Sequence, residues 1–513
     1  MKKQKSIAST LRLALSSNTF FWLVIGLFLL QAGWLAVSAS FPMLYDEYFH
    51  LSYIDMFSDQ YSPVISSQSP EELARFSDLT RNPQLLYHYI LSYPYRAIAS
   101  TIDSFYVSVT LLRIINVIMV AGGLIGYKKL FDRVLHRPIV SNLTVLFLTL
   151  LPVFIFVSAH INYDNLVFLI TPILLLKVIE LLDKKSIDSR KLLAILSLMI
   201  FGILIKLSFA VISLVCLIFI VYNSVKKRQK LKTKSLSGSI KIYTLIPYIF
   251  IFLLLSTMIF ERYIINAIQY RSIVPSCIAV HDNEACERFR YTRRATEAKT
   301  AFDLSDRTPE NIVIYTKDIW LPFIVEGATI VGTQYSFEDL DTQVAYSKTV
   351  RTGANPLSLI STYMWIFLAL SILFIAYSFR ELLATKHFRL LSITFIAVTL
   401  TLLVYYNYSS YVRLGQAFAV QLRYLLIVMP IFVYYAIFGF SIAVKRPVYK
   451  VAAFSFFIFI MSQGGGILAY IVSSDYNWYW QRETIVDINL YIKDKVEPYI
   501  LNSDGVTEGF NVE

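Results

Sequence analysis

The sequence predicts an all-α protein that crosses a membrane about eleven times, and three observations lead to that prediction. Of its 513 residues, 56% are apolar and only 16% are charged, whereas soluble proteins carry about 25% charged residues. The apolar residues gather in runs close to the roughly 20 residues that a helix needs to cross the hydrocarbon core. Aromatic residues, which anchor helices at membrane interfaces, make up 15% of the chain.

Basic residues give these crossings an orientation. The crossings are expected at 19–39, 106–126, 140–159, 163–182, 191–205, 207–223, 242–260, 357–378, 390–406, 418–442 and 450–472. Lys and Arg cluster in the short links between them, and the net charge is +12. Such links stay cytoplasmic, which places the N-terminus inside and the C-terminus outside. Topology therefore accounts for the charge, and no nucleic-acid partner is expected. The stretch 191–223 is short for two spans, so a broken or re-entrant pair is an equal alternative there.

The chain divides into a transmembrane module, 1–472, and a short extracytoplasmic C-terminal segment, 473–513. The module has two long outer segments, 40–105 and 261–356, of which the second forms a small outer-loop region. In the first, the aromatic stretch from Arg81 to about Tyr95 is too polar to cross the membrane and suits an interfacial helix.

Cysteine usage adds one expectation. Cys216 lies in the middle of a span and is read as inert packing. Cys277 and Cys286 lie close together in the second outer segment, so an oxidising compartment would allow a disulfide. Two unpaired thiols are the alternative.

Acidic residues and histidines mark a candidate site on the outer side. Asp46 and Glu47 directly follow the first crossing, and His50 comes one helical turn later. A carboxylate at a low-dielectric boundary is costly unless it is paired, hydrated or bound to metal, so such residues are candidates for function. His160 and Asp164 lie in the polar turn after the third crossing, on the same side. Polar residues that simply solvate a turn are the alternative at both places.

Two cations interrupt apolar runs. Lys206 lies at the outer end of the fifth crossing, and Arg423 lies one turn into the tenth, followed by Tyr424. A cation at bilayer depth costs at least ~2.5–3.5 kcal/mol unless it snorkels or finds an anion. Snorkelling would account for Lys206, whereas the planar fork of Arg423 matches phosphate. A lipid phosphate is the natural anion at that depth.

These elements resemble the GT-C superfamily of polytopic glycosyltransferases, and within it a group of bacterial membrane proteins of predicted glycosyltransferase function. The resemblance covers about residues 20–440. The matching elements are Asp46-Glu47-x-x-His50, Asn82-Pro83-x-Leu85-x-Tyr87, Asn162-Tyr163-Asp164, Lys206 followed by Ser208, and Arg423-Tyr424. The bacterial group usually has Pro where this chain has Tyr45, and Gly where it has Leu422, so the resemblance is closer to the superfamily than to the group.

The resemblance implies a GT-C-like architecture, a polyprenyl-phosphate sugar donor and an outer-face acceptor that is a cell-envelope glycan, lipid or protein. It also implies a base in the first outer loop, for which Asp46 is the candidate, with Glu47 beside it. Arg423, Lys206 and Tyr424 would hold the donor phosphate, because displacement at an anomeric carbon needs a base and a cation for the leaving phosphate. The substrate-lining candidates are His50, Asn82, Tyr87, His160 and Asp164.

Three further expectations concern partners and place. Some members of the superfamily use a divalent metal and others do not, so the resemblance does not decide metal dependence; Asp46, His50 and Asp164 are the candidate ligands for Mg or Mn. The basic cluster that includes Arg290, Arg293 and Arg294 would bind an anionic acceptor, or it is a solvated face with local ion pairs. We expect an integral protein of the bacterial plasma membrane, with membrane lipid as a partner.

Two other functions fit part of the pattern. A transporter or flippase of a lipid-linked or acidic substrate would also want intramembrane cations, but it often shows internal repeats, and none is evident here. A glycan polymerase or ligase would share the donor and differ in the acceptor.

Overall fold

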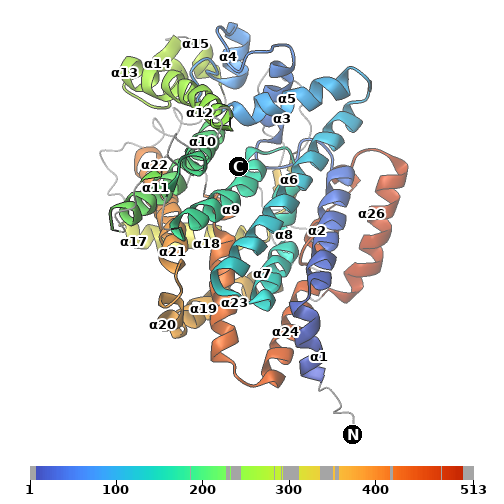
Figure 1. Ribbon diagram of the computed structural model, residues 1–513. Coiled ribbons are helices and arrows are strands. Elements are labelled where there is room, and N and C mark those ends of the chain that lie inside the picture. The colour runs from blue at the N-terminus through green and yellow to red at the C-terminus, as the bar shows by residue number, and fades with distance from the viewer. Residues whose placement is uncertain are drawn as a thin grey trace.

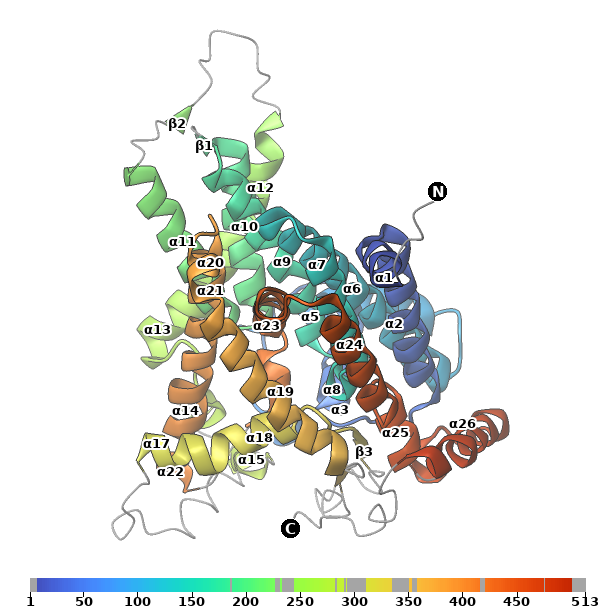
Figure 2. The same ribbon diagram turned by 90° about the horizontal axis from the view of Figure 1, so that it is seen from below.

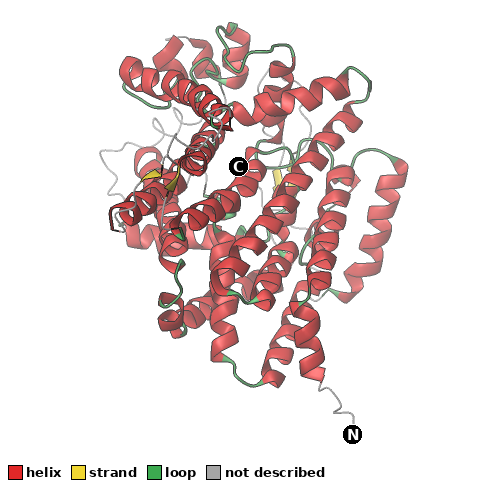
Figure 3. Cartoon of the chain, viewed as in Figure 1, coloured by secondary structure: helices red, strands yellow, loops and turns green. Residues whose placement is uncertain are grey.

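The computed structural model describes residues 7–184, 187–226, 231–232, 244–281, 284–289, 292, 311–334, 350–352, 358–415, 420–474 and 476–500. These residues are almost entirely helical (Figure 3). The strands within them have two or three residues each. β1 (Ile187–Asp188) pairs in parallel with β2 (Leu231–Lys232), and β3 (Gly332–Gln334) pairs in antiparallel fashion with β4 (Val350–Thr352). The predicted fold class, a helical protein, is confirmed.

Seven helices among the described residues are long and apolar enough to cross a membrane. They are α2 (Asn18–Ser38), α6 (Phe105–Leu135), α9 (Tyr163–Leu182), α11 (Phe209–Lys226), the continuous run Ile246–Tyr270, Ile360–Tyr377 within α19 (Ser358–Tyr377), and the continuous run Phe388–Leu414. The first run joins α12 (Ile246–Ile259), η2 (Phe260–Ile264) and α13 (Ile265–Tyr270). The second joins α21 (Phe388–Leu400), η5 (Thr401–Tyr408) and α22 (Ser409–Leu414). The chain is therefore a helical membrane protein, and the count of eleven crossings stays a prediction.

The third predicted crossing, 140–159, is bent instead of straight. α7 (Pro138–Leu150) and α8 (Pro152–Ser158) meet at an angle of 77°. Pro152 explains the bend, because proline disfavours helical backbone in the residue before it and supplies no N–H to the preceding turn. Leu151 accordingly has extended backbone, with ψ 119°. The pair counts as an eighth span if it is one broken crossing.

Shorter helices occupy the other predicted crossings. α10 (Ser189–Ile205) and α11 are separate helices on either side of the break at Lys206. The tenth crossing, predicted at 418–442, begins later than expected. The short turn η6 (Leu422–Leu425) precedes α23 (Met429–Ala443). Pro430 lies in the first turn of α23, where proline is tolerated. Arg423 therefore lies before that helix and not one turn inside it. The eleventh is divided into α24 (Pro447–Ser462) and α25 (Leu468–Ser473).

Glycines allow two of the central helices to pack closely. A Cβ atom on Gly123 of α6 would lie 2.4 Å from the ring of Phe168 on α9, and one on Gly126 would lie 2.9 Å from Pro172. Real side chains do not approach so closely, so only glycine permits this contact. The contact fixes α9, whose first turn carries Asp164, against α6, which carries Arg113.

The first predicted outer segment is folded into three helices at one end of the molecule. They are α3 (Glu47–Ser58), α4 (Pro70–Phe76) and α5 (Leu86–Ala99). Figure 1 shows α4 and α5 gathered there with α14 (Cys277–His281) and α15 (Glu284–Arg288), far from α1 (Ile7–Ser16) and α24. In Figure 2, β1 and β2 lie at the opposite end from α3 and α18 (Leu321–Glu326). The two predicted cytoplasmic links that carry β1 and β2 thus lie at the opposite end from α3, the helix that follows Asp46.

The remaining helices are short or peripheral. They are α17 (Ile312–Tyr315), η3 (Thr316–Trp320), α20 (Phe379–Leu383), η7 (Tyr476–Trp478), α26 (Glu483–Val496) and η8 (Glu497–Tyr499). α26 belongs to the predicted C-terminal segment and packs against α2 (Figure 1), where Trp34 donates to the side-chain oxygen of Asn489 at 3.0 Å.

Candidate active site

The site begins where the chain turns from α2 into α3. Tyr45 and Asp46 both have left-handed backbone, with φ 69° and 70°. Non-glycine residues seldom adopt this conformation, which persists where the surrounding structure fixes it. Asp46 stands at the position that caps α3, yet its side chain makes no capping hydrogen bond. Its carboxylate turns to Arg423 instead.

Arg423 connects this turn to the far end of the sequence. One terminal nitrogen donates to the Asp46 carboxylate at 2.9 Å and to the Tyr424 hydroxyl at 3.0 Å, and the other donates to the Tyr45 carbonyl at 2.8 Å. The guanidinium carbon lies 4.9 Å from the ring centres of both Tyr45 and Tyr424. The Arg423 side chain is 5% exposed, whereas that of Asp46 is 34% exposed. Asp46 is therefore the open end of a buried charge pair.

A second charge pair lies beside the first. Lys206, in the break between α10 and α11, forms an ion pair with Asp164, and both side chains are less than a tenth exposed. The Lys206 ammonium lies 4.8 Å from the ring centre of Tyr163 and 4.6 Å from that of Tyr424. Burial lowers the pKa of Lys206, although Asp164 opposes the shift. The Tyr424 ring thus contacts both cations, and joins the two pairs into one site.

Each ion pair contains one buried polar atom that lacks a hydrogen-bond partner in the described part of the chain. The Nε atom of Arg423 and the second carboxylate oxygen of Asp164 have no hydrogen-bond partner among the residues that the structure describes. A buried polar atom without a partner costs free energy, and it is often satisfied by a ligand. One donor and one acceptor are therefore available to a bound molecule.

Glu47 lies in a different environment from Asp46, its neighbour in the sequence. Its carboxylate is fully buried and forms a two-pronged ion pair with Arg113, with nitrogen–oxygen distances of 2.8 and 2.7 Å. The backbone N–H groups of Met43 and Ile161 also donate to it. Burial alone would raise the pKa of Glu47, but Arg113 holds it below the usual value. The Glu47 carboxylate is therefore held by groups of the protein itself, and its predicted catalytic role stays a prediction.

Arg113 is the residue that the sequence reasoning missed. It lies on α6 and also donates to the carbonyls of Ala39, at 2.5 Å, and Ser40, at 3.1 Å, at the end of α2. Arg113 and Glu47 together connect α2, α3, α6 and the start of α9. The signal was present, because Arg113 is a cation within the apolar run 106–126 and the argument that selected Lys206 applies to it equally.

The histidines pack around the charged groups. His50 on α3 and His88 on α5 share a hydrogen bond at 2.8 Å between Nδ1 and Nε2, and both are buried. Burial lowers the pKa of His88 to about 3, and burial followed by the nearby His88 and Arg423 lowers that of His50 well below its usual value. His160 is buried beside Tyr45, and burial lowers its pKa to about 4. All three are held as neutral groups.

Two of the predicted substrate-lining residues, Tyr87 and Asn82, form hydrogen bonds within the protein. The Tyr87 hydroxyl is buried and donates to Asn116 on α6 at 2.8 Å. The side-chain oxygen of Asn82 accepts from the backbone of Gln84, and the Gln84 side chain in turn accepts from the N–H of Leu207 at 2.9 Å. Asn82 thus shapes the turn that holds the Lys206 break in place.

The predicted metal site is not formed. Among the described residues, no three His, Cys, Asp or Glu side chains come close enough together to hold a metal ion. Asp46 pairs with Arg423, Asp164 with Lys206, and His50 with His88, so each candidate ligand faces a different partner. Arg290, Arg293 and Arg294, predicted to bind an acceptor, lie outside the described residues.

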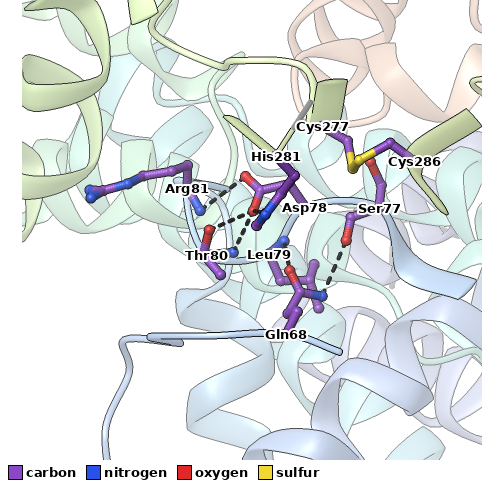
Figure 4. The surroundings of a disulfide bond; sticks show 9 residues. All are labelled: Gln68, Ser77, Asp78, Leu79, Thr80, Arg81, Cys277, His281 and Cys286. Atoms are coloured by element: carbon purple, nitrogen blue, oxygen red, sulfur yellow. Dashed lines mark hydrogen bonds and ion pairs between the residues drawn. A yellow bond between two sulfur atoms is a disulfide. The ribbon is translucent and has the colours of Figure 1, made fainter. Parts of the chain in front are cut away.

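The second predicted outer segment contains a disulfide and contacts the first predicted outer segment beside it. Cys277 and Cys286 form a disulfide, which confirms the pairing that the sequence allowed. Beside it, His281 contacts the Asp78 carboxylate at 2.8 Å, and Asp78 also accepts from Thr80 and Arg81 (Figure 4). Phe289, just after α15, packs edge-on against Phe49 of α3. The second segment therefore supports the helix that follows Asp46.

Seven residues from distant parts of the sequence form this site: Asp46, His50, His160, Asp164, Lys206, Arg423 and Tyr424. Two carboxylates balance two cations, and the Asp46 side chain is 34% exposed. Such an arrangement can accept a proton at Asp46 and hold an anion between Arg423 and Lys206. Comparison of the chain with protein-family models, with curated proteins and with solved structures gave no match.

Proposed function

We propose that this protein is a membrane glycosyltransferase that moves a sugar from a polyprenyl-phosphate donor to an acceptor at the outer face of the membrane. The observation that carries the proposal is the pairing of exposed Asp46 with buried Arg423, beside the Lys206–Asp164 pair. A base next to two cations is what displacement of a phosphate at an anomeric carbon requires. The GT-C-like sequence elements supply the same residues.

Asp46 acts as the base in this proposal. The acceptor hydroxyl oxygen forms a bond to the anomeric carbon while its proton passes to the Asp46 carboxylate. The bond from the anomeric carbon to the phosphate oxygen breaks, and polyprenyl phosphate leaves with the electron pair. A single displacement of this kind inverts the configuration at the anomeric carbon.

Arg423 and Lys206 stabilise the leaving phosphate. The guanidinium presents planar donors, including the unpaired Nε, and the ammonium also lies close to the Tyr424 ring. In a buried site these charges act with little screening. The free oxygen of Asp164 is an acceptor for a sugar hydroxyl. Glu47 and Arg113 keep the α2–α3 turn in place during the reaction.

The proposal is tested with purified protein in proteoliposomes, polyprenyl-phosphate donors that carry radiolabelled hexoses or pentoses, and an extract of host envelope glycans and lipids as acceptor. Wild-type protein should release polyprenyl phosphate and label the acceptor fraction. Asp46→Asn should lose roughly 10²–10⁴-fold in rate, while the control Asp494→Asn, at an exposed carboxylate on α26, should keep full activity. Movement of intact donor between leaflets without cleavage would instead identify a flippase, and equal rates for Asp46→Asn and wild type would remove Asp46 from the mechanism.

A further inference from the structure

A group of tyrosines surrounds the end of α3, away from the charged site. Arg96 on α5 donates to the carbonyl of Ser58 at 2.6 Å and to that of Gln60 at 2.8 Å. The Ser58 carbonyl is one that the last turn of a helix leaves without a partner, and Gln60 lies two residues beyond the end of α3. Arg96 thus closes the end of α3 and joins α5 to it.

The same arginine holds an exposed aromatic ring. Its guanidinium carbon lies 4.2 Å from the ring centre of Tyr61 and 5.6 Å from that of Tyr93. The Tyr89 hydroxyl donates to the Tyr61 carbonyl at 2.6 Å and lies 2.5 Å from the Tyr93 hydroxyl. Tyr61 and Tyr93 are nevertheless 77% and 45% exposed. We call Tyr61, Tyr89, Tyr93 and Arg96 the tyrosine platform.

Carboxylates lie beside the platform. Asp55 and Asp59 on the last turns of α3 are exposed. The Tyr95 hydroxyl bonds to Asp55, and partial burial together with this carboxylate raises the pKa of Tyr95 to about 12. Ionised carboxylates are costly in hydrocarbon. The platform therefore does not face lipid tails, and exposed aromatic rings beside carboxylates fit a polar partner with apolar faces.

We propose that the tyrosine platform binds the glycan part of the acceptor. This inference rests on the proposed function and names its acceptor class. A sugar ring presents C–H groups on one face, which suit the electron-rich face of an aromatic ring. Its hydroxyl groups donate to carboxylates such as Asp55 and Asp59. A ring held by cation–π contact and hydrogen bonds loses little freedom on binding, which favours affinity.

The distance to the charged site fits an extended glycan. The twelve residues from Asp46 to Ser58 run along α3 for about 18 Å. A glycan of several units that rests on Tyr61 would therefore reach Asp46 with its end hydroxyl. A lone monosaccharide would not contact both places, so the platform selects acceptors that already carry a chain.

The test measures glycan binding directly. Full-length protein in lipid nanodiscs is applied to an array of bacterial envelope oligosaccharides, and affinity for each retained glycan is measured by titration. Wild-type protein should retain one class of glycan. Tyr61→Ala should lower the affinity for that glycan about tenfold. Tyr61→Phe should keep most of the affinity, and Asp55→Asn should lower it. Tyr499→Ala is the matched control, because Tyr499 is 79% exposed and lies outside the platform. No glycan retained by wild-type protein, or equal affinities for Tyr61→Ala and Tyr499→Ala, would overturn the inference.

Asp46→Asn separates this inference from the proposed function. It should retain glycan with wild-type affinity while it loses transfer. If wild-type protein transfers no sugar but Tyr61→Ala still loses binding, the platform stands as a glycan site and the transferase assignment fails. If transfer is normal and the acceptor KM is unchanged in Tyr61→Ala, the platform inference fails and the transferase assignment stands.

Discussion

Arg423 donates to the carboxylate of Asp46 at 2.9 Å, although 377 residues separate them in the sequence. The same guanidinium bonds to the carbonyl of Tyr45, so it holds both left-handed residues of the turn between α2 and α3. The ion pair therefore sets the position of Asp46 as well as its charge. A phosphate that bound Arg423 would compete with Asp46 for the guanidinium, and would release the carboxylate next to the reacting carbon.

Replacement of Arg423 by Lys should weaken donor binding. Lysine keeps the positive charge but cannot bond to Tyr45, Asp46 and a phosphate with one planar fork. Loss of a charge-assisted hydrogen bond of about 1.5–3 kcal/mol corresponds to a donor KM about tenfold or more above wild type. Steady-state kinetics with varied donor would measure it. Arg413→Lys, at an exposed position on α22, is the control and should behave as wild type. An unchanged donor KM in Arg423→Lys would show that Arg423 only supports the turn.

Loss of Arg113 should destabilise the protein more than loss of any surface ion pair. Arg113→Met leaves the Glu47 carboxylate fully buried without its cation, which costs about 3–5 kcal/mol. The double variant Arg113→Met/Glu47→Leu removes both charges and should recover much of that stability. Thermal unfolding in detergent would compare them.

The exposed pair Lys177–Glu180 supplies the control. Lys177→Met should cost less than about 1 kcal/mol, because exposed pairs contribute little. If Arg113→Met unfolds at the same temperature as Lys177→Met, the buried pair does not hold α2, α3 and α9 together.

Part of the candidate site could be predicted because a charged residue at a membrane boundary is costly unless it is paired. That argument selected Asp46, Asp164, Lys206 and Arg423, although solvated turns or snorkelling were alternatives for the first three, and the structure pairs the four residues with one another. The partners could not be predicted in the same way. Pairing depends on which helices pack together, and the sequence does not show that α5 brings His88 to His50 or that α6 brings Arg113 to Glu47.

The fold could be predicted as far as apolar length determines it. The run 163–182 is a helix with the predicted bounds. Breaks were harder, because they depend on single residues. Pro152 bends the third crossing, and the tenth helix begins only at Met429, since the preceding residues form the turn that carries Arg423. Hydropathy alone did not reveal either break.

The predicted orientation of the chain can be measured with single cysteines. Lys317 lies in the second predicted outer segment and Lys386 in a predicted cytoplasmic link, with one predicted crossing between them; their side chains are 82% and 66% exposed. Lys317→Cys should react with a membrane-impermeant thiol reagent in intact cells, and Lys386→Cys only after permeabilisation. Background labelling should be low, because Cys216 is buried and the other two cysteines are bonded. Reaction of both variants from the same side would contradict the topology.

The buried histidines should make the protein less stable in mild acid. Burial lowers the pKa of His88 to about 3 and that of His50 well below the usual 6.5. In the unfolded chain both would take up protons as the pH falls through about 6.5, whereas the folded chain takes them up only at much lower pH. The unfolded state then binds more protons, so the free energy of unfolding falls with falling pH, by up to about 1.4 kcal/mol per pH unit for each histidine. Above pH 7 this effect is absent.

The window between pH 7 and 5 covers the range in which histidines of the unfolded chain titrate, and Arg113 holds the pKa of Glu47 below its usual value. The thermal midpoint of wild-type protein in detergent should fall across that range, and His88→Asn should lose part of the fall, since one buried titrating group is gone. His136→Asn changes an exposed histidine at the end of α6, where asparagine tolerates the left-handed backbone, and it should keep the wild-type slope. His160, whose pKa burial lowers to about 4, contributes in the same direction and remains in both variants. Equal slopes for His88→Asn, His136→Asn and wild type would mean that the His50–His88 pair is not held neutral in the folded protein.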